Sequence, residues 1–184
     1  IVAESNQVTI YDGDDPDMTM WMTFPVTNSS WLKHSGSGGC KAVVARDGIM
    51  LTGGDLRGSI VRFITDDGNV FEAGYNYEHH TITTRNTTVG PSTGPIRIAH
   101  NKVNDVAITV LPNAPIDADT GLPVPTIAVA TDGGVSVIKD DGNVYDSSDT
   151  NAYGSVEFID ERIVSDRNTS DTRYFISQKV STIT

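Results

Sequence analysis

The sequence is poor in residues that several classes of site and fold require. Cys40 is the single cysteine, which excludes an intrachain disulfide and a cysteine-rich zinc or iron-sulfur site. Only 13 basic residues face 24 acidic ones, and the formal charge of -11 repels phosphate backbones and anionic lipid. No apolar run approaches the roughly 20 residues of a membrane-spanning helix. We therefore expect neither nucleic-acid binding nor membrane insertion.

What is present suits one packed domain over residues 1–184. The chain is 38% hydrophobic and 20% charged, which is enough apolar material for a core. It starts at Ile1 and stops shortly after a strand-like run at 174–180. We expect this single all-β region to be a segment of a longer chain, with both ends inside a fold.

Short strands are the main local signal, because glycine, proline or polar clusters interrupt almost every window that could show helical spacing. Runs of β-branched and aromatic residues bounded by turn residues predict about fourteen strands and an all-β class. The predicted strands cover residues 8–10, 19–24, 42–45, 49–51, 60–64, 69–71, 81–84, 96–98, 106–110, 126–130, 135–138, 144–145, 155–158, 162–164 and 174–180.

Turn residues predict consecutive antiparallel hairpins. Asp-Gly pairs at 47–48, 67–68 and 141–142 stand between apolar runs, and Asp-Gly supplies the positive φ angles of tight hairpin turns. Residues 112–125 contain four prolines and predict a surface loop.

An internal repeat is the most informative feature of the organisation. Residues 64–72 match residues 138–146 around a shared Asp-Asp-Gly-Asn phrase, 74 positions apart, and a Gly-Gly pair precedes each copy. The repeat copies extend over approximately 42–72 and 126–146. Repeated hairpins bury their faces by stacking or by radial arrangement, so a propeller-like or meander array is expected. Two unrelated hairpins that use the same common turn are the alternative.

Three stretches, at 14–24, 103–117 and 121–138, resemble segments of large virion-associated proteins of marine tailed phages. The phrase Asn104-Asp105-Val106-Ala107 with the proline-rich loop after it is the most distinctive part. The resemblance implies propeller-like regions in a tail, fibre or appendage, and hence a structural or host-recognition role in the virion, an extracellular particle. It implies no catalytic residues.

Candidate binding residues follow from side-chain chemistry. Asp12, Asp14 and Asp17 crowd hard oxygen ligands into a glycine-bearing loop, which is the ligand type that calcium prefers, although solvated acidic side chains are the commoner explanation. Aromatic rings stack on sugars and anchor interfaces, with core packing as the alternative. The candidates for contact with a carbohydrate or a receptor are Trp31, Tyr75, Asn76, Tyr77 and Tyr153.

The sequence holds no recognisable catalytic set. Cys40 has no matched histidine and base, and the Asp-box phrase and arginine cluster of sialidase propellers are missing. We expect a non-enzymatic part of a phage tail or fibre, without a cofactor other than a calcium ion. Its expected partners are copies of itself, other virion proteins or a host-surface glycan. The alternatives are a secreted carbohydrate-binding β-domain and, third, a fragment of a glycoside hydrolase.

Overall fold

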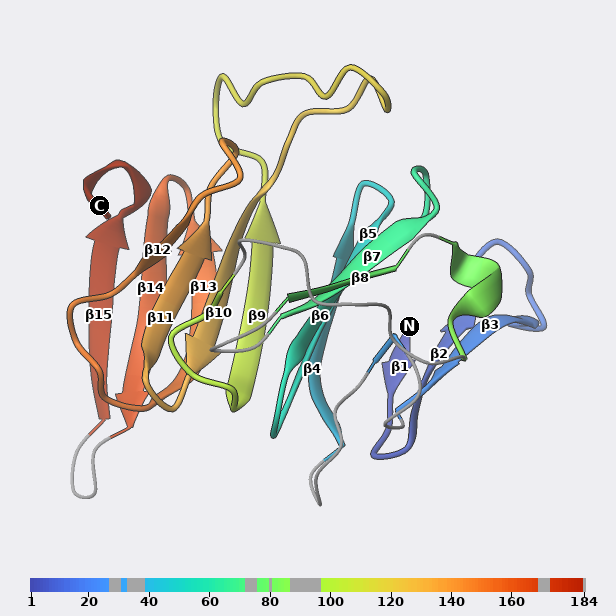
Figure 1. Cartoon of the computed structure of the whole chain (residues 1–184), viewed down its shortest axis with the longest axis horizontal. Helices are drawn as coiled ribbons and strands as arrows, with labels where there is room; N and C mark the ends of the chain where they lie inside the picture. Colours follow the sequence, from blue (N-terminus) through green and yellow to red (C-terminus); the bar gives the residue numbers. More distant parts are fainter. Residues whose placement is uncertain are drawn as a thin grey trace.

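The chain folds into four antiparallel sheets, which confirms the all-β class (Figure 1). The computed structural model describes residues 1–26, 31–32, 39–71, 76–79, 81–86, 97–168 and 173–183. Two short 3-10 helices, η1 (Ile82–Thr84) and η2 (Val180–Thr182), are the helical elements within those ranges.

Each sheet is a meander, in which strands that follow one another in the chain pair with one another. The first sheet holds β1 (Val2–Ala3), β2 (Gln7–Tyr11) and β3 (Met20–Pro25), and the second holds β4 (Cys40–Arg46), β5 (Ile49–Gly54), β6 (Gly58–Arg62), β7 (Asp67–Phe71) and β8 (Asn76–His79). The third holds β9 (Val103–Thr109), β10 (Thr126–Thr131), β11 (Gly134–Ile138) and β12 (Val144–Asp146), and the fourth holds β13 (Tyr153–Ile159), β14 (Arg162–Asn168) and β15 (Arg173–Lys179).

Three apolar layers join the four sheets face to face. The first layer lies between the first and second sheets, the second layer between the second and third, and the third layer between the third and fourth. Successive residues of a strand point to opposite faces, so Met50 enters the first layer and its neighbour Leu51 enters the second. Both faces of the second and third sheets are therefore buried, which explains why β10 and β11 are buried along their whole length.

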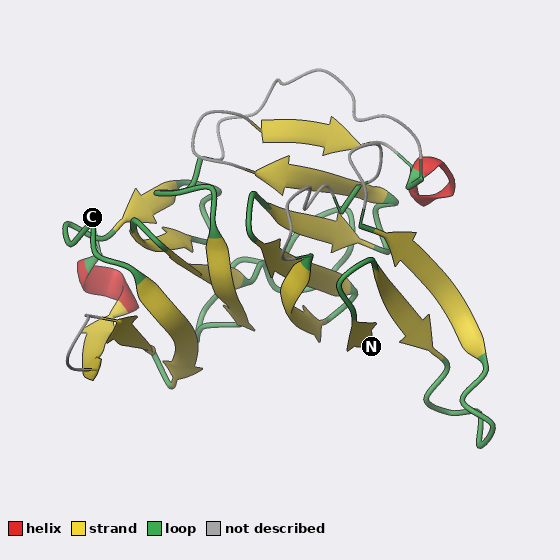
Figure 2. Ribbon diagram, turned by 90° about the horizontal axis from the view of Figure 1, so that it is seen from below, coloured by secondary structure: helices red, strands yellow, loops and turns green. Residues whose placement is uncertain are grey.

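The sheets follow one another along the molecule, with the first and fourth at opposite ends (Figures 1 and 2). The opening strands of neighbouring sheets lie side by side, β1 against β4, β4 against β9 and β9 against β13. These strands are at the edge of their sheets, and each leaves one row of backbone groups without a strand partner in its own sheet.

The second, third and fourth sheets share one register, although their sequences differ. In each, the opening strand carries one extra residue where it pairs with the end of the next strand: Lys41 in β4, Asn104 in β9 and Gly154 in β13. On the second strand of these sheets, Met50, Ile127 and Ile163 each pair with the fourth residue after the bulge. Each of the three is buried in the layer shared with the preceding sheet. The three sheets are thus structural repeats.

The two copies of the sequence phrase occupy the corresponding hairpin, β6–β7 in the second sheet and β11–β12 in the third. The phrase lies at different positions in the two hairpins, however. Asp67 and Gly68 lie in β7 with Asp66 at a φ of 58°, whereas Gly142 lies in the loop at a φ of 78°. The expected left-handed turn glycine is confirmed at Gly142 and at Gly48, and it is wrong at Gly68.

Several predicted boundaries were also wrong. Residues 81–84, predicted as a strand, hold η1, and Arg97 and Ile98 lie outside any strand. The strands β1 and β8 were missed, because β1 spans two residues and β8 is a polar run. The proline-rich segment 112–125 is the predicted surface loop, and it carries one isolated bridge between Ile116 and Pro123.

Candidate functional site

A groove of about 530 Å³ runs along the opening strands β4, β9 and β13. Apolar side chains line both sides, with Val43 and Val44 on one side and Val156 and Phe158 on the other, but polar atoms make up the larger part of the exposed lining. Arg46 and Glu157 supply exposed charges of opposite sign. The volume falls within the roughly 300–1,000 Å³ of ligand sites.

Asp105 lies in this groove and joins the third sheet to the fourth. One carboxylate oxygen accepts the backbone N–H of Val106 at 2.9 Å and the other accepts that of Val156 at 2.9 Å. Burial raises the pKa of the Asp105 carboxyl, while the two N–H donors lower it and the charge of Glu157 adds to the rise. Because each oxygen accepts a backbone N–H, the carboxylate serves to cover a free edge of β13.

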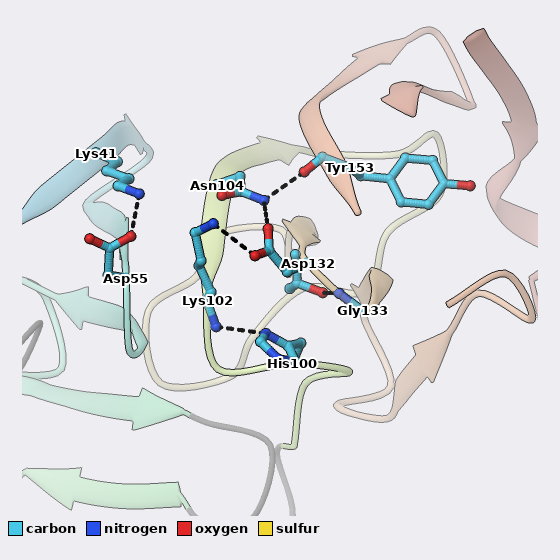
Figure 3. A network of polar contacts seen from close by, with 9 residues as sticks. Lys41, Asp55, His100, Lys102, Asn104, Asp132, Gly133 and Tyr153 are labelled. Carbon is cyan, nitrogen blue, oxygen red and sulfur yellow. Dashed lines mark hydrogen bonds and ion pairs between the residues drawn. The ribbon is translucent and has the colours of Figure 1, made fainter. Parts of the chain in front are cut away.

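A network of charged side chains lies at the start of the same strands (Figure 3). Asp132, which follows β10, accepts hydrogen bonds from Lys102 Nζ at 2.7 Å and from Asn104 Nδ2 at 2.7 Å. Asn104 Nδ2 also donates to the backbone oxygen of Tyr153 at 2.9 Å, which ties the third sheet to the fourth. In the second sheet, Lys41 pairs with Asp55 in the equivalent place.

Electrostatics favour the ionised forms in this network. Burial alone would raise the pKa of Asp132, but the hydrogen bonds from Asn104 and Lys102 outweigh it and the net pKa is lowered. The hydrogen bond to Asp132 in turn raises the pKa of Lys102. The network therefore consists of paired ions at neutral pH, an arrangement that holds strand ends in place.

Among the described residues, the aromatic candidates do not come together. Trp31 is 2% exposed, stacks on the His79 ring at 4.8 Å between centroids, and packs in the first layer. Tyr153 is buried in the third layer, where burial and Asp149 raise its pKa to about 12. Trp31 and Tyr153 therefore pack in the core, which was the alternative to contact with a carbohydrate or receptor. Tyr77 is half-buried on β8, with the Arg57 guanidinium carbon 6.0 Å from its ring centroid.

Two candidates fall at the limit of the described chain. Tyr75 lies outside the described residues, and the backbone of Asn76 opens β8 opposite Phe71.

The acidic loop between β2 and β3 uses carboxylates for its own turns. An Asp12 oxygen accepts the Asp14 N–H at 3.0 Å, and Asp15 accepts the Asp17 N–H at 3.0 Å. Within the described ranges, no three His, Cys, Asp or Glu side chains converge to hold a metal ion. The calcium hypothesis for Asp12, Asp14 and Asp17 therefore gains no support from this loop.

Sequence reasoning missed the polar residues that matter most here. Asn104, Asp105 and Asp132 entered the sequence analysis only as members of the stretches 103–117 and 121–138, with no role assigned to any of them. Their roles depend on contacts between sheets or between strands far apart in the sequence, which leave no local pattern. Among the described residues, no helix is both long and apolar enough to cross a membrane.

Comparison with known proteins gives little beyond the fold description. No family model matches the chain, and no curated protein matches it. Among solved structures, the computationally designed Ika4 protein aligns over 79% of this chain and 94% of its own, with 10% identity and a TM-score of 0.38. The description of the fold therefore rests on the strand order and packing of this chain.

Proposed function

We propose that the chain is a non-enzymatic structural component of a phage tail or fibre, displayed on the extracellular particle, where it also contacts the host surface. One observation carries the proposal: three sheets with a common register stack through continuous apolar layers. Such an array is a rigid scaffold in which each unit contacts only its neighbours. The likeness of residues 14–24, 103–117 and 121–138 to virion-associated proteins agrees with this role.

In this proposal the sheets are blades of a propeller-like array. Sequential meanders that pack face to face, with their opening strands side by side, are the arrangement expected of blades. Among the described residues, the three layers join the four sheets in a row, and no fourth layer joins the last sheet to the first. The chain would then supply part of a larger ring, completed by copies of itself or by other virion proteins.

The groove along β4, β9 and β13 is the surface we assign to host contact, because a host-surface glycan needs both apolar wall and hydrogen-bonding groups. A secreted carbohydrate-binding β-domain would use the same groove. A glycoside hydrolase would need two carboxyl groups across the scissile bond. Asp105 and Glu157 are the acidic pair in the groove, and the two backbone hydrogen bonds of Asp105 favour a structural use of it.

An antibody raised against the purified chain tests the assignment by immunogold electron microscopy of tailed phage particles. We expect label on tails or fibres. Hydrolysis of glycans or esters by the chain at enzymatic turnover would overturn the proposal. Glycan-array binding without turnover, combined with unlabelled particles, would support the carbohydrate-binding alternative. A compact monomer in light scattering at high concentration would contradict the incomplete ring.

A further inference from the structure

The proline-rich loop encloses a cavity of about 120 Å³ against the turns of the second sheet. Ile49, Arg62 and Ile64 form the side that belongs to the sheet, and Leu122, Pro123 and Val124 form the side that belongs to the loop. Figure 1 shows this loop, between β9 and β10, reaching beyond the ends of the strands. The cavity is smaller than the roughly 300–1,000 Å³ of small-molecule sites, so it suits a single side chain.

Hydrogen bonds within the loop hold its side of the cavity in place. Asp117 accepts hydrogen bonds from the Thr120 N–H at 2.8 Å and from its hydroxyl at 2.9 Å. The N–H groups of Asp117 and Val124 donate to the backbone oxygens of Leu122 at 2.9 Å and Pro115 at 2.8 Å. Prolines further restrict the backbone. A preformed wall lowers the ordering cost of binding.

The cavity has an apolar lip and an acidic rim. Ile64 lies in a turn and is 55% exposed, although it lines the cavity together with the aliphatic side chains of Ile49, Leu122 and Val124. Asp47 and Asp117 line the opening, and Asp47 forms a solvent-exposed ion pair with Arg46 at 3.3 Å. The charge of Arg62 is already matched, because its Nη1 donates to Asp67 at 2.8 Å and to Asn69 at 2.7 Å.

Acidic groups also continue past Arg62. There a second hollow of about 210 Å³ is lined by Asp67, Asn69 and Glu78 as well as Arg62. A ligand that lies across both hollows meets an aliphatic socket whose lining carries the carboxyl groups of Asp47, Asp67, Asp117 and Glu78 and one cation, Arg62.

We propose that this cavity is a docking site for an extended segment of a partner protein that inserts one large aliphatic side chain flanked by lysine or arginine. Small preformed apolar pockets with a polar rim are where interfaces concentrate their binding energy. The basic flanks follow from charge complementarity with the rim. A second copy of this chain fits poorly, since its formal charge is -11. The proposal does not rest on the virion role.

Peptide titration of the full ¹⁵N-labelled chain tests the site by NMR. The probe is acetyl-Lys-Leu-Lys-amide, compared with acetyl-Lys-Gly-Lys-amide, which lacks the anchor, and acetyl-Glu-Leu-Glu-amide, which reverses the charge. We expect saturable shifts at Ile64, Leu122 and Val124 with the first peptide, and binding about tenfold weaker or absent with the others. Equal response to all three peptides, or shifts confined to other residues, would overturn the proposal.

A pair of matched variants separates the cavity from general surface effects. Ile64→Asp should weaken binding about tenfold. Ile159→Asp, at a residue of similar exposure (52%) on β13 and away from the cavity, should leave it unchanged. If Ile64→Asp proves unfolded by circular dichroism, Thr65→Lys adds a positive charge at an exposed cavity residue and should weaken binding through the rim. Equal weakening by Ile159→Asp contradicts the site, as does loss of self-association in Ile64→Asp, which would identify a second copy as the occupant.

Discussion

The second and third sheets contain the same sequence phrase in the same hairpin, yet they use it differently. In the third sheet, Ile138 ends β11 and is 6% exposed, whereas the matching Ile64 of the second sheet lies in a turn and is 55% exposed. Met50 and Ile127 are equivalent when the strand pairs are counted from the bulge. Met50 pairs with Val61 and Ile127 pairs with Ile138, so Val61, not Ile64, occupies the position of Ile138.

This difference shows what sets the register of a sheet with two buried faces. A shift by one residue would exchange the contents of two apolar layers, so layer packing dominates over turn chemistry. The turn residues then adopt whichever local conformation closes the hairpin. Asp66 takes the positive φ in one copy and Gly142 takes it in the other.

The largest expected effect tests whether the two sheets form one cooperative unit. Leu51→Ala and Ile127→Ala each remove a buried side chain from opposite sides of the second layer, and each should cost about 2–5 kcal/mol of unfolding free energy. Urea unfolding, followed by tryptophan fluorescence and by circular dichroism, should give coincident transitions for both variants. Separate transitions for Ile127→Ala would show that the third sheet unfolds independently.

The next effect separates the two copies of the phrase. An added Cβ at Gly68 would lie 2.6 Å from the Ile60 oxygen and 3.1 Å from the Trp31 ring, so Gly68→Ala should cost about 1–3 kcal/mol through overpacking. Gly142 has open space and a φ of 78°, so Gly142→Ala should cost about 1–2 kcal/mol through backbone strain alone.

Asparagine distinguishes these two causes, since it tolerates positive φ but is larger than alanine. Gly142→Asn should recover stability relative to Gly142→Ala, and Gly68→Asn should lose more than Gly68→Ala. Thermal or urea unfolding of the four variants measures this. The same response at both glycines would mean that the two hairpins share a conformation.

A smaller effect concerns the acidic residue that follows the second strand of the second and third sheets, Asp55 and Asp132. Asp132→Asn should cost about 1–2 kcal/mol, because the carboxylate accepts two hydrogen bonds, whereas Asp55→Asn loses one partly exposed ion pair and should cost about 0–1 kcal/mol.

The pH dependence of stability checks the role of Asp132. Since its folded pKa is lowered, its contribution is complete above the ordinary value of 3.8 and is lost as the pH falls through the folded pKa. Asp132→Asn should therefore flatten the loss of stability below about pH 4. An unchanged acid slope would show that the ion pairs do not act on folding.

The smallest effect is expected at the first residue of the opening strands, where the second sheet has Cys40 and the third has Val103. Both are buried, so Cys40→Val should cost less than about 1 kcal/mol. In the native chain, burial raises the pKa of the Cys40 thiol to about 11, and iodoacetamide should modify it slowly at neutral pH. Rapid labelling of the folded protein would contradict this environment.

Much of the fold followed from local sequence, and most of the polar site did not. β-branched runs located nearly all strands of four or more residues, because those strands face apolar layers on one or both sides. The polar strand β8 and the helix η1 had no such pattern. Trp31 and Tyr153 looked like loop aromatics, since the layers that bury them are made by other sheets. Asp105 contacts the next sheet and Asp132 contacts side chains at the start of the neighbouring strand, and spacing along the chain does not encode those contacts.

The bulge at the start of the opening strands has a further consequence for how such a chain can diversify. Lys41, Asn104 and Gly154 occupy one equivalent position with three different chemistries, while the apolar layers beside them keep the same register. An inserted residue leaves the alternation of the strand, so its side chain is released from the demands of both neighbouring layers. Substitution there changes the charge and reach of one rim of the molecule without repacking the apolar layers, and at Asn104 it also breaks the hydrogen bonds to Asp132 and to the Tyr153 backbone oxygen.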